Sequence, residues 1–334
     1  MEGENMKTRR IGTTDIEASV IAFGAWAIGG GPWWGETDDN ESIRAIHAAL
    51  DGGVNLIDTA PVYGWGRSEE VVGKAIAGRR DQVVLATKCG LWWHDRRGPV
   101  FFELEGHTVR RLLRPDTIRR EVEDSLRRLG TDHIDLYQTH WQTTEPDKDP
   151  IAETMECLVR LREEGKIRAI GASNVDIEHI RQYQAAGVLD AIQPRYSMLD
   201  RQIERDLLPY CREHAISTLV YSPLEQGLLT GRIGMDYVIA PGEYRGNIPW
   251  FKPANRRRVL DMLAGWKGLT EKYACTLSQL VIAWTLAQPG ITFALCGARK
   301  AVHSSENAAA GSLVLEEADL GKMRTDVERL GAPE

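Results

Sequence analysis

Cysteine is scarce and unpaired in this sequence. Its 334 residues include five cysteines, with no CxxC spacing among them: Cys89, Cys157, Cys211, Cys275 and Cys296. This odd number at wide spacing predicts neither a disulfide framework nor a structural zinc site. The pattern is typical of a protein kept in a reducing compartment, so we expect a cytoplasmic location.

Long apolar runs are also absent. No stretch approaches the ~18 apolar residues of a membrane span, and the opening MEGENMKTRR lacks the apolar core of a signal peptide. A net charge of -7 argues against nucleic acid or an anionic membrane as a partner, despite basic clusters at 110–111 and 256–258. With 43% hydrophobic residues, the chain has the composition of a globular protein with a sizeable core.

Short apolar runs alternate with amphipathic segments along the chain. The runs lie at 20–23, 54–57, 83–86, 134–137, 167–170, 191–192, 217–220 and 293–296, and apolar residues at helical spacing follow most of them. About eight strand–helix units without a compositional break predict an α/β fold, a single (β/α)8 TIM barrel domain over residues 1–334. Residues 6–18, around Gly12, are expected to form a hairpin that plugs or flanks the barrel.

A doubly wound open sheet is the structural alternative. Such a sheet more often carries a GxGxxG fingerprint after its first strand, and Gly29–Gly31 matches that fingerprint only weakly. A nicotinamide cofactor would therefore be bound in some other way. Two connections, 89–114 and 223–254, are too long for simple links in a compact domain, and we predict that they are substrate or cofactor loops.

Four ionisable residues follow predicted strands: Asp58, Tyr63, Lys88 and His140. The carboxyl ends of parallel strands meet at one rim, so we expect these side chains to converge there. Each residue alone could have a purely structural role: Asp58 could cap a loop, and Lys88 could be a solvated surface charge. A metal site at His140 and Asp58 is disfavoured, because no second histidine lies at a strand end.

The chemistry of these four residues favours a carbonyl reaction. An ammonium such as Lys88 stabilises the phenolate of Tyr63, which would make the phenol a better proton donor. Asp58 would keep Lys88 charged, and neutral His140 would donate a hydrogen bond to the substrate oxygen. A Schiff-base lyase that uses Lys88 as nucleophile is a second possibility.

Several segments resemble motifs of the aldo-keto reductase family, in the family's order. They are DTAPVYGWGRSEEVVG, ATK, IDLYQTH, GKIRAIGASN, YSPLEQGLLTGR and GARKAVHSSEN, and together they span nearly the whole chain. The resemblance implies that Asp58, Tyr63, Lys88 and His140 form the catalytic tetrad, and that Tyr63 protonates a carbonyl oxygen as hydride leaves NAD(P)H. The style of the motifs is similar to the bacterial sugar-aldehyde and potassium-channel β-subunit-like branches.

The same resemblance implies the cofactor site. Its expected residues are Trp26, Ser173, Asn174, Gln193, Tyr221, Ser222, Leu224, Gln226, Gly231, Arg232, Gly297, Ala298, Arg299, Lys300, Glu306 and Asn307. NADPH is the expected cofactor and NADH the alternative, since Arg299 could contact a 2′-phosphate. The family often has Gln where this chain has His303, which weakens the preference for NADPH.

Tryptophan is the one abundant aromatic, with ten residues. Trp26, Trp65, Trp92 and Trp141 fall near strand exits, where we expect them to contact substrate. The expected function is NADPH-dependent reduction of a small polar aldehyde, a sugar-derived one included, to the alcohol. The alternative is an NADPH-binding regulatory or sensor subunit with little turnover. The oligomeric state is left open.

Overall fold

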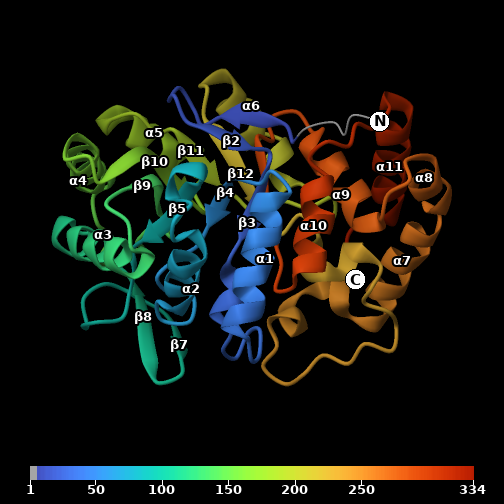
Figure 1. Ribbon diagram of the computed structural model, residues 1–334, viewed down its shortest axis with the longest axis horizontal. Helices are drawn as coiled ribbons and strands as arrows, with labels where there is room; N and C mark the ends of the chain where they lie inside the picture. Colours follow the sequence, from blue (N-terminus) through green and yellow to red (C-terminus); the bar gives the residue numbers. More distant parts are fainter. Residues whose placement is uncertain (1–5) are drawn as a thin grey trace.

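A closed barrel of eight parallel strands forms the centre of the molecule (Figure 1). The computed structural model describes residues 6–334. The barrel strands are β3 (Ile21–Gly24), β4 (Leu56–Asp58), β5 (Val84–Cys89), β9 (Ile134–Thr139), β10 (Ile167–Ser173), β11 (Ala191–Gln193), β12 (Ser217–Tyr221) and β13 (Phe293–Gly297). Each pairs with the next along the chain, and β13 pairs with β3, so the predicted (β/α)8 fold is confirmed.

Helices surround the barrel. They are α1 (Asp39–Asp51), α2 (Arg67–Ile76), α3 (Pro115–Leu129), α4 (Ile151–Glu163), α5 (Ile177–Ala186), α6 (Leu207–Glu213), α7 (Pro253–Ala264), α8 (Lys267–Lys272), α9 (Leu277–Leu286), α10 (Ala301–Ala309) and α11 (Glu317–Leu330). Helix α3 shows how the sequence sets the bounds: Pro115 opens it, and Gly130 ends it in the left-handed conformation. Over residues 6–334, no helix is both long and apolar enough to cross a membrane.

The amino-terminal hairpin closes one mouth of the barrel. Strands β1 (Thr8–Arg10) and β2 (Glu17–Ser19) pair antiparallel, and Ile11 and Ile16 are buried among the barrel's inner side chains. Gly12 donates its backbone N–H to Ser217 Oγ at 2.8 Å. A Cβ at Gly12 would lie 2.6 Å from the carbonyl oxygen of Asp190, so only glycine fits this turn. The predicted hairpin is confirmed, and it plugs the amino-terminal end.

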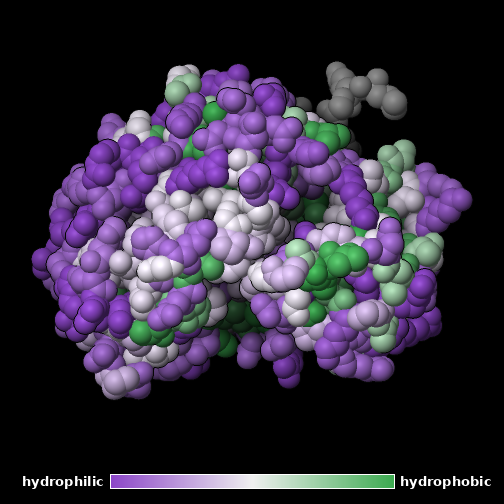
Figure 2. Space-filling model, turned by 90° about the horizontal axis from the view of Figure 1, so that it is seen from below, coloured by the Kyte–Doolittle hydropathy of each residue, from purple (hydrophilic) through white to green (hydrophobic). Residues whose placement is uncertain are grey.

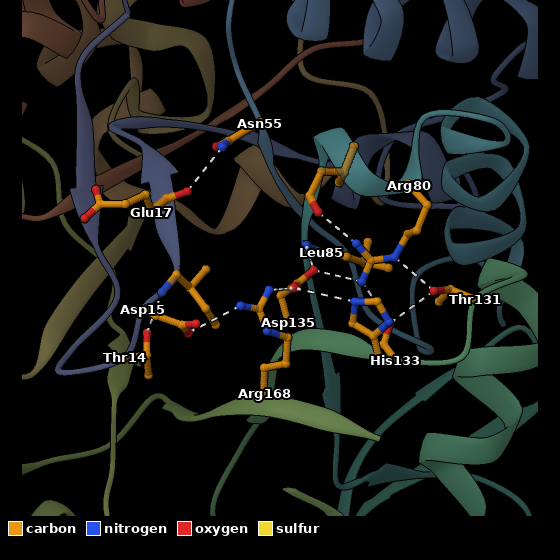
Figure 3. A network of polar contacts seen from close by, with 12 residues as sticks. Thr14, Asp15, Glu17, Asn55, Arg80, Leu85, Thr131, His133, Asp135 and Arg168 are labelled. Carbon is orange, nitrogen blue, oxygen red and sulfur yellow. Dashed lines mark hydrogen bonds and ion pairs between the residues drawn. The ribbon is translucent and has the colours of Figure 1, made fainter. Parts of the chain in front are cut away.

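A polar network fastens the strands at the same end (Figure 3). The carboxylate of Asp135, at the start of β9, is 1% exposed. It accepts hydrogen bonds from Arg80 Nη2 at 2.8 Å, from the Leu85 backbone N–H at 2.8 Å and from Arg168 Nη1 at 2.7 Å. Arg168 also reaches Asp15 in the hairpin at 3.3 Å. One carboxylate therefore ties β5, β9 and β10 together, and Arg168 extends the network to the plug.

Residues 89–114, which we predicted to form a loop, contain regular structure, so that part of the prediction is wrong. The segment forms a three-stranded antiparallel sheet of β6 (Leu91–Trp92), β7 (Val100–Leu104) and β8 (His107–Arg111). Strands β7 and β8 are joined by Glu105 and Gly106, both at positive φ, as a tight hairpin turn requires. The sheet projects from the carboxyl end of the barrel (Figure 1), and its exposed side chains hide the apolar alternation that marks a buried strand.

The second long connection, 223–254, has no strand. It contains three short 3-10 turns: η4 (Glu225–Thr230), η5 (Tyr244–Asn247) and η6 (Pro249–Phe251). Within it, Trp250 and Phe251 are buried against the core. This connection therefore has an anchored end beside α7 and a part that lies along the carboxyl rim.

Replacing Asp135 by Asn should lower the free energy of unfolding by about 3 kcal/mol. The asparagine NH2 group would face N–H donors that the carboxylate oxygen now accepts from. The loss of the negative charge would also leave the guanidinium groups of Arg80 and Arg168 without their shared counter-ion. Urea unfolding followed by tryptophan fluorescence measures the change. Asp15→Asn is the control, because this exposed residue shares the Arg168 contact but not the burial. An equal, small effect of both variants would contradict a buried role for Asp135.

Candidate functional site

Strand alternation places polar side chains inside the carboxyl end of the barrel. Ala86 and Leu136 are buried in the inner layer of apolar side chains. Two residues further along each strand, Lys88 and Gln138 take the same inward direction. Figure 2 looks onto this rim, where the surface is hollowed and apolar side chains lie in and beside the hollow. The inner layer thus changes from apolar to ionisable at the depth where the strands end.

Asp58 is the centre of this layer. Its Oδ1 accepts a hydrogen bond from Lys88 Nζ at 2.6 Å, and its Oδ2 accepts from Gln138 at 3.1 Å and from Gln193 at 2.8 Å. Lys88 also donates to the carbonyl oxygen of Thr59 at 2.9 Å. Asp58 is 2% exposed and Lys88 is fully buried. The two opposite charges are therefore held out of water as a closely hydrogen-bonded pair.

Tyr63 and His140 lie above this pair. The two ring centroids are 5.7 Å apart and the rings meet edge to face at 83°. Lys88 Nζ lies 5.2 Å from the centroid of the Tyr63 ring. The structure thus brings together all four residues that the sequence predicted at one rim.

A close approach of two backbones holds Tyr63 in place. Gly29 ends the short turn η1 (Trp26–Gly29), and a Cβ there would lie 2.7 Å from the Tyr63 carbonyl carbon. A Cβ on Gly64 would lie 2.3 Å from the Gly29 carbonyl oxygen. Trp65 then takes a left-handed conformation with φ of 56°, which is costly for a tryptophan. The strained turn fixes the tyrosine beside the strand end.

The acidity expected for Tyr63 needs correction. Burial, and secondly the Asp58 carboxylate, raise the pKa of Tyr63 well above its usual value. The Lys88 ammonium does not offset this rise in pKa, because it donates its hydrogen bonds to Asp58 and to the Thr59 carbonyl oxygen. The pair presents little net charge to the phenol. Tyr63 is consequently a neutral hydrogen-bond donor across the physiological pH range.

His140 is also neutral. Burial lowers its pKa well below the usual value, and the Lys88 charge adds to this effect. Its backbone N–H donates to the Cys89 carbonyl oxygen at 2.8 Å, which joins the exits of β9 and β5. A neutral imidazole carries one donor nitrogen and one acceptor nitrogen. His140 is therefore suited to orient an oxygen atom held beside Tyr63, as the sequence predicted.

Four of the predicted cofactor residues form one hydrogen-bonded chain. Tyr221 donates its hydroxyl to Asn174 Oδ1 at 2.9 Å, and Asn174 Nδ2 donates to Ser173 Oγ at 3.0 Å. Ser173 Oγ donates to the backbone carbonyl of Gln193 at 2.9 Å. These residues come from the ends of β10, β11 and β12, so three neighbouring strands shape one wall of the rim.

Eleven further predicted cofactor residues continue from this wall, and Trp26 lies apart from them beside Tyr63. Ser222, Leu224, Gln226, Gly231 and Arg232 follow β12, and Gly297, Ala298, Arg299, Lys300, Glu306 and Asn307 follow β13. Arg232 is paired with Glu306, and Arg299 Nη1 donates to the backbone carbonyl of Trp34 at 2.8 Å. Among residues 6–334, Ser304 Oγ and Glu306 Oε1 are buried without a hydrogen-bond partner. The two arginines suit the phosphates of a dinucleotide, and the unmatched hydroxyl and carboxylate oxygens suit its sugar hydroxyls.

The four predicted substrate tryptophans do not all lie together. Trp26 and Trp65 line the same small space beside Tyr63, and the ring centroids of Trp26 and Tyr63 are 6.2 Å apart. Trp141 instead packs against Phe101 of the three-stranded sheet. Trp92 is 1% exposed, with the Arg120 guanidinium 5.4 Å from its ring. Because it offers almost no surface to a ligand, the structure argues against its predicted role.

Sequence reasoning missed two residues of the rim. Gln138 contacts Asp58, and its signal was available, because it lies between inward-facing Leu136 and His140 at the strand period of two. Tyr244 comes from the second long connection and packs its ring 5.4 Å from that of Trp26. No local pattern marks it, since its position depends on the path of an irregular segment.

Comparison with known proteins agrees with this arrangement. The model of the Aldo/keto reductase family matches residues 20–326. The chain belongs to this family. It is 49% identical to the NADH-specific methylglyoxal reductase of Escherichia coli (strain K12), over 97% of this chain and 99% of that protein.

Solved structures give the same family. The glycerol dehydrogenase AKR11B4 from Gluconobacter oxydans superposes with a TM-score of 0.86 at 39% identity, covering 100% of this chain and 98% of that one. An aldo-keto reductase from Klebsiella pneumoniae in complex with NADPH gives a TM-score of 0.72 at 30% identity, covering 98% and 96%. The predicted enzyme class, an oxidoreductase that uses a nicotinamide cofactor, is confirmed.

Acid should destabilise the protein through His140. Because its folded pKa is depressed, the unfolded chain binds a proton below pH 6.5 that the folded chain does not. The stability that this difference contributes is present above pH 6.5 and is lost as pH falls, by up to about 2 kcal/mol at pH 5. The free energy of unfolding of wild type and His140→Gln, measured at pH 7 and pH 5, isolates the effect. A variant with the wild-type pH dependence would contradict it.

Proposed function

We propose that this aldo/keto reductase converts the carbonyl of a small polar aldehyde, sugar-derived ones included, to the alcohol. The observation that carries the proposal is the convergence of Tyr63 and His140 above the buried Lys88–Asp58 pair. Two relatives support the substrate class by their names, since methylglyoxal and glycerol are both small and polar. Small-molecule carbonyl compounds are therefore the expected partners.

In this proposal Tyr63 is the general acid. When bound, the nicotinamide cofactor supplies the hydride. Tyr63 donates a hydrogen bond to the carbonyl oxygen and gives up its proton as negative charge develops there. A raised phenol pKa is compatible with this role, because the alkoxide that develops is a strong base and takes a proton even from a weakly acidic phenol. The neutral form required for reduction is the one that burial favours.

The other three residues orient and support Tyr63. His140 donates one hydrogen bond to the same oxygen and fixes the direction of the carbonyl. Lys88 and Asp58 fill the space beneath the phenol and exclude water from its base. Gln138 and Gln193 saturate the second carboxylate oxygen. His140, Lys88 and Asp58 therefore contribute a fixed arrangement of dipoles around Tyr63, and none of them supplies the proton.

We further propose that the cofactor lies along the ends of β10 to β13. Ser173, Asn174 and Gln193 would bind the carboxamide and Tyr221 would stack on the nicotinamide ring. Ser222, Leu224, Gln226, Gly231 and Arg232 would follow the pyrophosphate, and Gly297 to Lys300 with Glu306 and Asn307 would hold the adenosine end. Unmatched polar atoms on α10 support this assignment. The relatives' names include both NADH and NADPH, so the choice between them is an experimental question.

Two broader expectations complete the proposal. The predicted span of one barrel domain is 1–334; its described part, 6–334, supports this through the closure of the sheet between β3 and β13, and residues 1–5 lie outside the described residues. The protein is cytoplasmic, supported by five cysteines that are all free thiols.

Wild type should oxidise NADH or NADPH with a panel of small aldehydes, and Tyr63→Phe should slow hydride transfer by about 10²–10⁴-fold. The substitution keeps the ring packing and removes only the acidic hydrogen, so cofactor affinity should change little. The measurement is single-turnover loss of cofactor absorbance with saturating aldehyde. Tyr244→Phe is the matched control, because it removes a rim phenol that packs on Trp26. Cofactor binding without turnover in wild type would favour the sensor alternative.

Arg299→Ala should weaken NADPH by about tenfold and leave NADH binding nearly unchanged, if Arg299 contacts the 2′-phosphate. We expect the lower end of the range for a charged contact, because Arg299 must give up its hydrogen bond to Trp34. Quenching of tryptophan fluorescence gives both dissociation constants. Arg257→Ala, an exposed arginine on α7, controls for overall charge. Equal losses for both cofactors would show that Arg299 does not read the phosphate.

A further inference from the structure

The tip of the β7–β8 hairpin reaches the segment that carries Tyr63. Glu105 Oε2 accepts a hydrogen bond from Trp65 Nε1 at 2.8 Å. The same carboxylate lies over Gly31, where a Cβ would be 3.7 Å from Oε2. Three residues before Glu105 on the hairpin, the ring of Phe102 meets the ring of Trp33 edge to face at 5.3 Å. The hairpin tip thus touches two rim segments, one after β3 and one after β4.

These contacts enclose a small pocket beside Tyr63. Its lining residues come from 30–33, 62–65 and the hairpin tip, together with Trp26. The enclosed space is about 10 Å³, room for roughly one water molecule. Because Tyr63 and Glu105 both line this space, a substrate chain that extends from Tyr63 toward the hairpin tip meets Glu105.

Among the residues that the structure describes, Glu105 is the only charged one that lines this pocket. Over residues 6–334 it has no ion-pair partner within 4 Å, while the nearby cations are engaged elsewhere. Lys88 is paired with Asp58, Arg67 is paired with Asp39, and Arg111 lies over the rings of Phe101 and Trp141. The carboxylate therefore acts on its surroundings with a full negative charge, screened by solvent on its exposed side.

We propose that Glu105 is a specificity-determining residue that selects neutral, hydroxyl-bearing aldehydes over aldehydes that carry a carboxylate or a phosphate. The inference rests on the proposed function and specifies the charge of the aldehydes that the enzyme prefers. A carboxylate accepts hydrogen bonds from hydroxyl groups at the far end of a substrate. It repels an anionic group at the same place. The wall of the pocket opposite Glu105 is aromatic, so no cation compensates for the repulsion.

The test compares two aldehydes of similar length and reactivity, 4-oxobutanoate and its methyl ester. We expect wild type to favour the ester in kcat/KM by about twofold to fivefold at low ionic strength, the range for charges that interact at a solvent-exposed surface. Glu105→Gln should remove most of this ratio, chiefly through KM for the anion. The glutamine still offers an oxygen to Trp65. Added salt should reduce the ratio in wild type and leave it unchanged in the variant.

Glu103→Gln is the matched control, because this residue is an exposed carboxylate on the same hairpin that does not line the pocket. It should keep the wild-type ratio. A ratio that Glu105→Gln does not change, or that Glu103→Gln changes equally, would overturn the proposal and leave the reductase function intact. Failure of wild type to reduce either aldehyde would instead overturn the proposed function, and the selection with it.

Discussion

The buried pair of Lys88 and Asp58 is the constraint on which the carboxyl end of the barrel depends. Two charges removed from water cost several kcal/mol each unless every polar atom finds a partner. Burial lowers the pKa of Lys88, and the Asp58 carboxylate opposes that shift. The pair stays ionic because Gln138, Gln193 and the Thr59 carbonyl complete its hydrogen bonds. Strands β4, β5, β9 and β11 must therefore keep a common register at this depth.

The pair also explains why Tyr63 is not made acidic by its neighbour. A lysine that is fully engaged with a carboxylate contributes a dipole, not a free positive charge, to the phenol above it. The protein thus holds Tyr63 as a neutral donor and leaves the proton transfer to be driven by the oxygen that receives it. The same buried environment keeps His140 neutral. Both effects follow from exclusion of water rather than from any single contact.

The sequence predicted the barrel because each strand contains a short, mainly apolar run and most of the runs lead to a polar residue at the strand exit. It also predicted the four converging residues, since parallel strands end at one rim. It did not predict the sheet of β6 to β8, because only Leu91, Trp92 and Val109 in these strands are buried, which leaves no apolar alternation to mark them. Trp92, which was expected at the rim, is buried with the Arg120 guanidinium of α3 over its ring. The sequence did not predict the position of Tyr244 at the rim for a different reason. Its contact with Trp26 is set by tertiary packing of an irregular segment, which has no periodicity to read.

The rim segment 30–35 is contacted from both of its ends. Arg299, which follows β13, donates to the backbone of Trp34, and the hairpin carboxylate Glu105 lies over Gly31. Between these contacts, the ring of Trp26 meets the ring of Trp34 at 5.1 Å and lies beside Tyr63. A positive group and a negative group therefore hold opposite ends of one short wall. Trp34, Trp26 and Tyr63 therefore form a continuous aromatic path from the Arg299 contact to the buried Lys88–Asp58 pair.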